Sequence, residues 1–188
     1  MKVLKRWAHE ESGCIPYVWG GCSFITTHKK NTFSTITKKN YSAFVRNNNH
    51  ESSPKSGFDC SGIISRAAQL SGIPYFLKNT TTLERVLKPL TPEETLREGD
   101  LIKITGHVMV VADLENNTLI EARGYQDGYG KVHEIALPLV FKGINSYQDL
   151  LDAYYAKKTL IRLNSDGKES QIFPTFNLLR LESAWQES

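Results

Sequence analysis

The spacing of hydrophobic positions divides the chain into a helical part followed by a strand-rich part. Over residues 60–72, apolar side chains recur at helical spacing, with Ile63, Ile64 and Ala67 on one stripe. A glycine and then a proline follow this stripe, which is typical of a helix C-terminus. A shorter stripe of the same period predicts an amphipathic helix over residues 2–13.

From Leu101 onward the hydrophobic period changes to two. Five runs of β-branched, alternating residues predict strands: "LIKITG", "HVMVVADL", "TLIEARG", "GYGKVHEIAL" and "YAKKTLIRL". A short helix is predicted near "SYQDLLDAY". Because helices come first and consecutive strands follow, the pattern predicts an α+β fold with N-terminal helices packed on an antiparallel β-sheet.

Two long polar segments interrupt these patterns. Residues 23–57 are rich in Ser, Thr, Asn and Lys, and we interpret them as a polar insertion. Segments of that length in compact domains are typical of functional lids or of disordered regions. Residues 164–188 are interpreted as a C-terminal tail with an aromatic patch, "IFPTFNLL". The whole chain, residues 1–188, is predicted to form a single domain.

Composition and charge exclude several classes of protein. The chain has 188 residues, of which 40% are hydrophobic and 23% charged, as expected for a globular protein. The net charge of +3 is too small to indicate a nucleic-acid partner. No run is long enough for a membrane span, and the N-terminus lacks the apolar core of a signal peptide. Export to the cell envelope by another route, processing from a longer chain and a cytoplasmic location all stay open, as does the oligomeric state.

The cysteines show no pattern of a metal site. Cys14, Cys22 and Cys60 are an odd number, so at least one thiol is free if any disulfide forms. A bridge between Cys14 and Cys22 stays open. The sequence has no C-x-x-C pair and no histidines at zinc-finger spacing around the cysteines. We therefore expect no metal and no organic cofactor.

Cys60 stands where the first long helix is predicted to begin, in "SGFDCSG". Asp59, directly before it, is a residue type that caps helix N-termini. An ordinary thiol has a pKa near 8.5, but the exposed N–H groups and the dipole at a helix N-terminus favour the thiolate. The same N–H groups suit the oxyanion of an acyl intermediate. Cys60 is thus a candidate nucleophile, and burial as a small apolar residue is the alternative.

The candidate base is His107, which begins the apolar strand "HVMVVAD". Glu121 is a charged residue inside the next apolar strand and is the candidate to orient the imidazole. His133, in "KVHEIAL", is the alternative for that role. A three-residue turn or a bulge between the strands places His107 and Glu121 on one face of the sheet, whereas a two-residue turn places them on opposite faces.

The order of these motifs resembles that of the NlpC/p60 family of cysteine peptidases. The matching elements are "YVWGG", "FDCSG" opening a helix, "EGDLI" and "GHVMVV", and the resemblance covers about residues 17–132. It implies a papain-like core that cleaves amide bonds in bacterial peptidoglycan stem peptides, in many members between D-γ-glutamyl and a diamino acid. It also implies that Cys60 is the nucleophile and His107 the base.

The resemblance extends to residues around the nucleophile. It implies that Tyr17 stands beside the thiol and that its hydroxyl contributes to the oxyanion site. Asp59 and Ser61 match positions that bind the substrate peptide in some members, and Asp59 acting only as a helix cap is the alternative. We interpret Trp19 as a core aromatic residue.

Two features depart from the family pattern. The third polar residue of the family is most often histidine, whereas this chain has Glu121, whose carboxylate also suits an orienting role. The segment 23–57 is longer and more basic than in the family pattern.

The predicted function is therefore a cysteine peptidase or amidase with peptidoglycan peptides as substrate. A Cys–His acyltransferase or deamidase of the same fold, and a catalytically silent binding module, are the alternatives.

Overall fold

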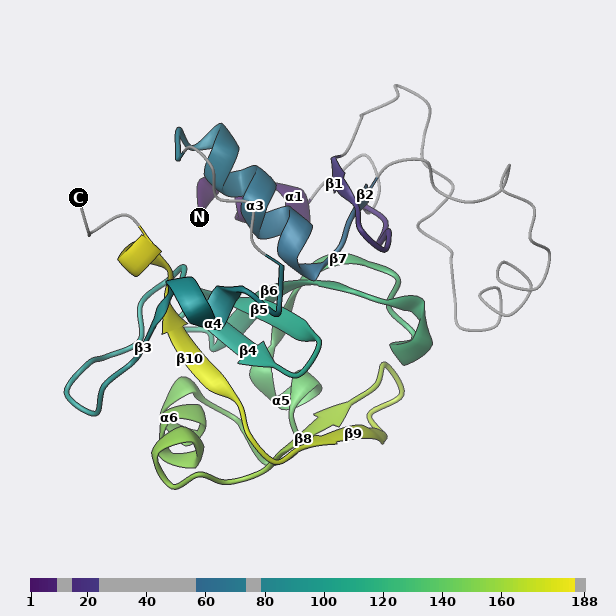
Figure 1. The fold of residues 1–188 in the computed structure, drawn as a ribbon. Helices are drawn as coiled ribbons and strands as arrows, with labels where there is room; N and C mark the ends of the chain where they lie inside the picture. Colours follow the sequence, from purple (N-terminus) through teal and green to yellow (C-terminus); the bar gives the residue numbers. More distant parts are fainter. Residues whose placement is uncertain (10–14, 24–56, 74–78, 185–188) are drawn as a thin grey trace. The chain divides into compact units, whose positions relative to one another are not determined.

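The computed structural model describes residues 1–9, 15–23, 57–73 and 79–184 (Figure 1). The chain forms two compact units, and each is described by itself. The helix unit comprises Lys2–Leu77 and Ala122–His133, and the sheet unit comprises Met1, Lys78–Glu121 and Glu134–Ser188. Except for its two end residues, the predicted insertion at 23–57 lies outside the described residues, and so does Cys14.

In the helix unit, two helices lie side by side, α1 (Lys2–Ala8) and α3 (Cys60–Leu70) (Figure 1). The predicted apolar stripe of α3 is buried, and Gly72, directly after the helix, has a positive φ of 81°, a conformation that glycine adopts readily. Strands β1 (Cys22–Ser23) and β2 (Gly57–Phe58) form a short antiparallel pair. The predicted long helix is thus confirmed. The helix predicted over residues 2–13 ends at Ala8, His9 lies in a turn, and residues 10–13 lie outside the described residues.

The sheet that contains the predicted strands has six members in the order β3-β10-β4-β5-β6-β7. Their bounds are Lys88–Pro89 for β3, Asn177–Arg180 for β10, Leu101–Ile104 for β4, His107–Asp113 for β5, Thr118–Arg123 for β6 and Lys131–Ala136 for β7. The pairings of β3 with β10, β10 with β4, β4 with β5 and β5 with β6 are all antiparallel. The predicted α+β class with an antiparallel sheet is confirmed.

The core of the sheet unit lies against one face of this sheet. Ile102 and Met109 are paired in register on that face, and neither is exposed to solvent. The same buried cluster contains residues of α5 (Leu137–Val140), α6 (Tyr147–Tyr155) and β8 (Leu160–Leu163). Helix α6 lies where a short helix was predicted, and a capping box fixes its first turn. One sheet face, two helices and an added strand thus enclose a single apolar core.

The segment from residue 164 onward is not the polar tail that we predicted. Strand β9 (Glu169–Phe173) pairs with β8, and β10 lies inside the main sheet between β3 and β4. Leu178 and Leu179 point to opposite faces of β10, yet both are buried. For β10 the prediction failed because a strand covered on both faces has no polar–apolar alternation to reveal it.

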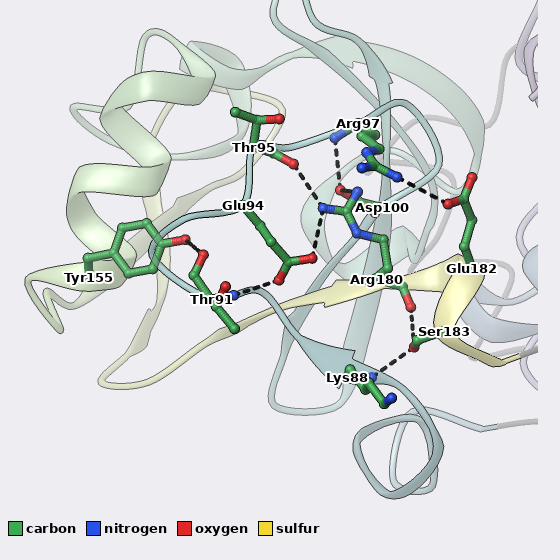
Figure 2. Close-up of polar contacts among 10 residues, drawn as sticks. All are labelled: Lys88, Thr91, Glu94, Thr95, Arg97, Asp100, Tyr155, Arg180, Glu182 and Ser183. Atoms are coloured by element: carbon green, nitrogen blue, oxygen red, sulfur yellow. Dashed lines mark hydrogen bonds and ion pairs between the residues drawn. The ribbon is translucent and has the colours of Figure 1, made fainter. Parts of the chain in front are cut away.

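An ion pair anchors the end of β10 to the turn before β4 (Figure 2). The Arg180 guanidinium donates from one nitrogen to Asp100 Oδ2 at 2.9 Å and from the other to the Thr95 carbonyl at 2.9 Å. Asp100 Oδ2 also accepts the backbone N–H of Arg97 at 2.8 Å, and Glu94 Oε1 lies 3.6 Å from the guanidinium. Burial raises the pKa of the Asp100 carboxyl above its ordinary value, and Arg180 opposes that shift.

Candidate functional site

The predicted site residues fall into two groups, one in each unit. The helix unit contains the candidate nucleophile and the residues around it, and the sheet unit contains the candidate base and its partner. The first group is Tyr17, Asp59, Cys60 and Ser61, and the second is His107 and Glu121. Each group has its own local geometry, which follows from the elements that carry it.

Cys60 is the first residue of α3, as the sequence predicted. It is not in a disulfide and is only 7% exposed. Asp59 is the N-cap: its Oδ1 accepts the backbone N–H of Ser61 at 3.0 Å and of Gly62 at 2.6 Å. A small thiol at a capped helix N-terminus has the environment that favours a thiolate.

Asp59 also holds the "YVWGG" turn against the start of α3. Its Oδ2 accepts the Gly20 N–H at 3.0 Å, and its own N–H donates to the Gly21 carbonyl at 2.9 Å. A Cβ on Gly62 would lie 2.0 Å from that carbonyl, so only glycine fits at this point of the helix. The segments "YVWGG" and "FDCSG" therefore form one folded junction, and Asp59 is the residue that joins them.

The other residues named around the nucleophile have defined local partners. The Ser61 hydroxyl donates to Asp59 Oδ1 at 3.1 Å, so both residues belong to the cap. Tyr17 donates its N–H to the Gly130 carbonyl at 2.9 Å, and its half-buried ring lies edge-on to Tyr125. Trp19 is 86% exposed, so its interpretation as a core residue was wrong. Trp19 stands in the turn that leads to Gly20, where an apolar side chain need not be buried.

In the sheet unit, a bulge sets which residues share a face. Val111 pairs with Leu119, but the next paired residue along β5 is Asp113, opposite Thr118. The extra residue on β5 is a β-bulge, and continuing the register beyond it puts Glu121 on the same face as His107. The predicted condition, an odd-length turn or a bulge, is thus met by a bulge.

His107 and Glu121 are hydrogen-bonded through the outer nitrogen of the imidazole. His107 Nε2 lies 2.7 Å from Glu121 Oε2, and the Glu121 side chain has no solvent exposure. When Glu121 is ionised, its carboxylate only accepts hydrogen bonds; Nε2 then carries the proton, and Nδ1 is the nitrogen that can act as a base. His133, the alternative orienting residue, lies in the helix unit with its ring edge-on to Tyr129.

Arg162 is a site residue that the sequence analysis missed. It lies on β8, is 2% exposed, and donates from Nη2 to the same Glu121 Oε2 that contacts His107. Its Nη1 lies 3.8 Å from the sulfur of Met109. The sequence does contain a signal for this residue. Arg162 lies two positions after Leu160, on the buried face of an apolar strand, and Glu121 is likewise a buried charged residue in the apolar strand β6.

Metal ligands, a second thiol and membrane-spanning helices also bear on what the described residues can do. Within them, no group of three or more His, Cys, Asp or Glu side chains is placed to hold a metal ion. Cys22 is an exposed free cysteine, which provides a natural comparison for Cys60. None of the described helices is both long enough and apolar enough to cross a membrane.

Comparison with known proteins finds a partial structural similarity. No protein-family model matches the chain, and no curated protein matches it either. The peptidoglycan hydrolase RipB from Mycobacterium tuberculosis is similar in structure, with a TM-score of 0.42 and 24% sequence identity. The similarity covers 72% of this chain and 57% of the RipB chain, so this chain matches little more than half of that protein.

Proposed function

We propose that this chain is a thiol amidohydrolase that cleaves amide bonds in peptidoglycan stem peptides. The observation that carries the proposal is the bond between His107 Nε2 and the buried Glu121 carboxylate. It gives the histidine of the motif "GHVMVV" a fixed tautomer and an orienting partner, as a general base requires. The capped helix start around Cys60 supplies the matching environment for a thiolate nucleophile.

In the proposed reaction, His107 and Cys60 exchange one proton during each half of the cycle. The Cys60 thiol passes its proton to His107 Nδ1, and the resulting thiolate attacks the amide carbonyl carbon and forms a C–S bond. The C–N bond then breaks, and His107 returns the proton to the leaving amine. Water, deprotonated by His107, attacks the thioester, the C–S bond breaks, and the thiol is restored.

The oxyanion of each tetrahedral intermediate needs hydrogen-bond donors near the Cys60 sulfur. The N–H groups of Ser61 and Gly62 donate to Asp59, so they serve the cap instead. The proposal therefore uses the N–H of Cys60 itself and the hydroxyl of Tyr17. Under this proposal Asp59 acts on catalysis by holding the junction, and its role and that of Ser61 in binding substrate come from the family resemblance.

The proposed substrate follows from the same resemblance. The bond between D-γ-glutamyl and a diamino acid is the one that we propose, and the cell envelope is the place where this substrate occurs. The mild net charge of +3 suits an anionic wall polymer as a nearby surface. No metal or organic group takes part in the proposed steps.

Digestion of purified muropeptides, with product masses as the readout, tests the proposal. The wild type should release peptides cut at the γ-glutamyl bond, and Cys60→Ala should release none. Cys22→Ala is the matched control, because Cys22 is a free but exposed thiol, and it should retain full activity. Identical, uncleaved patterns for wild type and Cys60→Ala would contradict the proposal. Ammonia release without chain cleavage would indicate a deamidase, and acyl transfer to an added amine would indicate a transferase.

A further inference from the structure

The Glu121 carboxylate presents an electrostatic problem that His107 alone does not solve. Its side chain has no solvent exposure, and an ionised carboxylate without a compensating charge is very costly at such a position. A neutral imidazole donating one hydrogen bond supplies no charge. If His107 were the only partner, the buried carboxylate would favour the imidazolium and hold its proton. Such a histidine would accept a proton readily but release it poorly.

Arg162 supplies the missing charge from outside the main sheet. Its side chain is 2% exposed, and its Nη2 donates to Glu121 Oε2, the oxygen that also contacts His107. A guanidinium stays protonated at every relevant pH, so it compensates the carboxylate without taking part in proton transfer.

The backbone around Arg162 is fixed from two sides. It bridges Phe141 on one side and pairs with Gln171 of β9 on the other. The β8–β9 register shifts directly after Arg162, and such irregularities re-aim a side chain. Nη1 lies 3.8 Å from Met109 Sδ, so the two terminal nitrogens of the guanidinium contact two different side chains, those of Met109 and Glu121. A lysine, with a single ammonium group, would supply the charge but could not reproduce both contacts.

We propose that Arg162 is a positioning residue that acts on His107 through Glu121. It balances the charge of Glu121, so that Glu121 holds the Nε2 proton of His107 without locking His107 as the imidazolium. With Arg162, the group of three is neutral when His107 is neutral and carries +1 when His107 is protonated. Without Arg162 these charges become −1 and 0, so protonated His107 becomes more stable relative to neutral His107. The importance of this for hydrolysis rests on the proposed function, but the effect on His107 does not.

The test is the titration of the His107 ring, followed by NMR in a Cys60→Ala background. This background removes the nucleophile, so the measurement needs no activity. Arg162→Met should raise the titration midpoint of His107 by about 1–3 pH units, the usual effect of a close charge. Arg162→Lys keeps the charge and should stay within about half a unit of the parent, by the same reasoning. If Arg162→Met does not fold, Arg162→Gln carries the same prediction with a polar side chain of similar reach.

Arg180→Met is the matched control, because it breaks another buried arginine–carboxylate pair in the same unit. It should leave the His107 midpoint unchanged, whereas a general loss of packing would affect both variants alike. A folded Arg162→Met or Arg162→Gln protein whose His107 titrates like the parent overturns the inference. If the midpoint shifts as expected but muropeptides are not cleaved, the inference stands and the proposed function fails. If muropeptides are cleaved and the midpoint does not shift, the reverse holds.

Discussion

Two buried arginine–carboxylate pairs in the sheet unit have similar chemistry but different surroundings. Arg180 and Asp100 are held by backbone groups on both sides, and the further charged partner of Arg180 is the partly exposed Glu94 carboxylate at 3.6 Å (Figure 2). Arg162 and Glu121 share one carboxylate oxygen with a titratable ring, that of His107. The first pair therefore fixes a turn, whereas the second connects to a histidine ring that can act as a base. The difference shows that the third partner, and not the ion pair itself, distinguishes a structural pair from a candidate catalytic one.

The Arg180–Asp100 pair is also separated from His107. Ile104 is opposite His107 in the β4–β5 register, and Asp100 lies four residues earlier, about 13 Å along an extended chain. Substitutions at the Arg180–Asp100 pair should therefore have little direct effect on His107. The predictions below test whether the two pairs really differ in this way.

The largest expected effect is on stability, and it should be similar for both pairs. Arg162→Met and Arg180→Met each leave a buried carboxylate without its cation, which costs about 3–5 kcal/mol of unfolding free energy. Urea unfolding at pH 7 measures this for each variant. If Arg162→Met costs nothing, its pair with Glu121 is not formed in solution and the comparison fails.

The second effect is on activity, and it should separate the two pairs. Glu121→Gln keeps a hydrogen-bond acceptor for His107 but removes the negative charge, so kcat/KM for a peptidoglycan peptide should fall roughly 10- to 100-fold. Asp100→Asn is the matched change at the other pair, and it should leave kcat/KM unchanged in the folded protein. Equal losses for the two variants would contradict the distinction drawn between the pairs.

The smallest effect is on the pH dependence of stability, and it concerns Asp100. Burial raises the pKa of Asp100 in the folded protein, so the folded state binds this proton more tightly than the unfolded chain does. Its contribution to stability is therefore highest at acid pH and falls as the pH rises from the unfolded value of 3.8 through the raised pKa. The Asp100→Asn variant should not show this decrease in stability with rising pH.

The difference between the two unfolding curves, measured from pH 3.5 to 6, isolates this contribution. Other carboxyls act in the opposite direction: the hydrogen bond from Lys103 lowers the pKa of Glu84, whose contribution is lost as the pH falls. A wild-type curve parallel to that of Asp100→Asn would show that burial does not raise the pKa of Asp100.

The sequence revealed those parts of the fold and site that depend on local pattern. The helix at Cys60, its Asp59 cap and the strands from Leu101 onward all follow from hydrophobic period and capping chemistry. The pairing of His107 with Glu121 required the register of two strands, and the sequence supplied only the condition that a bulge or an odd turn must satisfy. The bulge between Val111 and Asp113 meets that condition.

The parts that the sequence did not reveal depend on contacts between distant segments. Strand β10 has no alternation because both its faces are buried. Its pairing partners in the sheet, β3 and β4, precede it by more than seventy residues. Arg162 carried the same signal as Glu121, a charge on the buried row of an apolar strand. That signal can be interpreted only when the partner of the charge is known. The strand pairing pattern could not identify Glu121 as this partner, because β8 pairs with β9 and is not part of the main sheet.

The central claim is that Cys60 is a thiolate nucleophile paired with His107, and the pH profile of Cys60 alkylation tests it most directly. In a Cys14→Ser, Cys22→Ser protein, Cys60 is the only thiol that iodoacetamide can modify. The account predicts rapid modification already at pH 6, and a shift of the profile in His107→Ala toward that of an ordinary thiol, whose midpoint is about 8.5. An ordinary profile in the parent protein that His107→Ala leaves unchanged would contradict the claim.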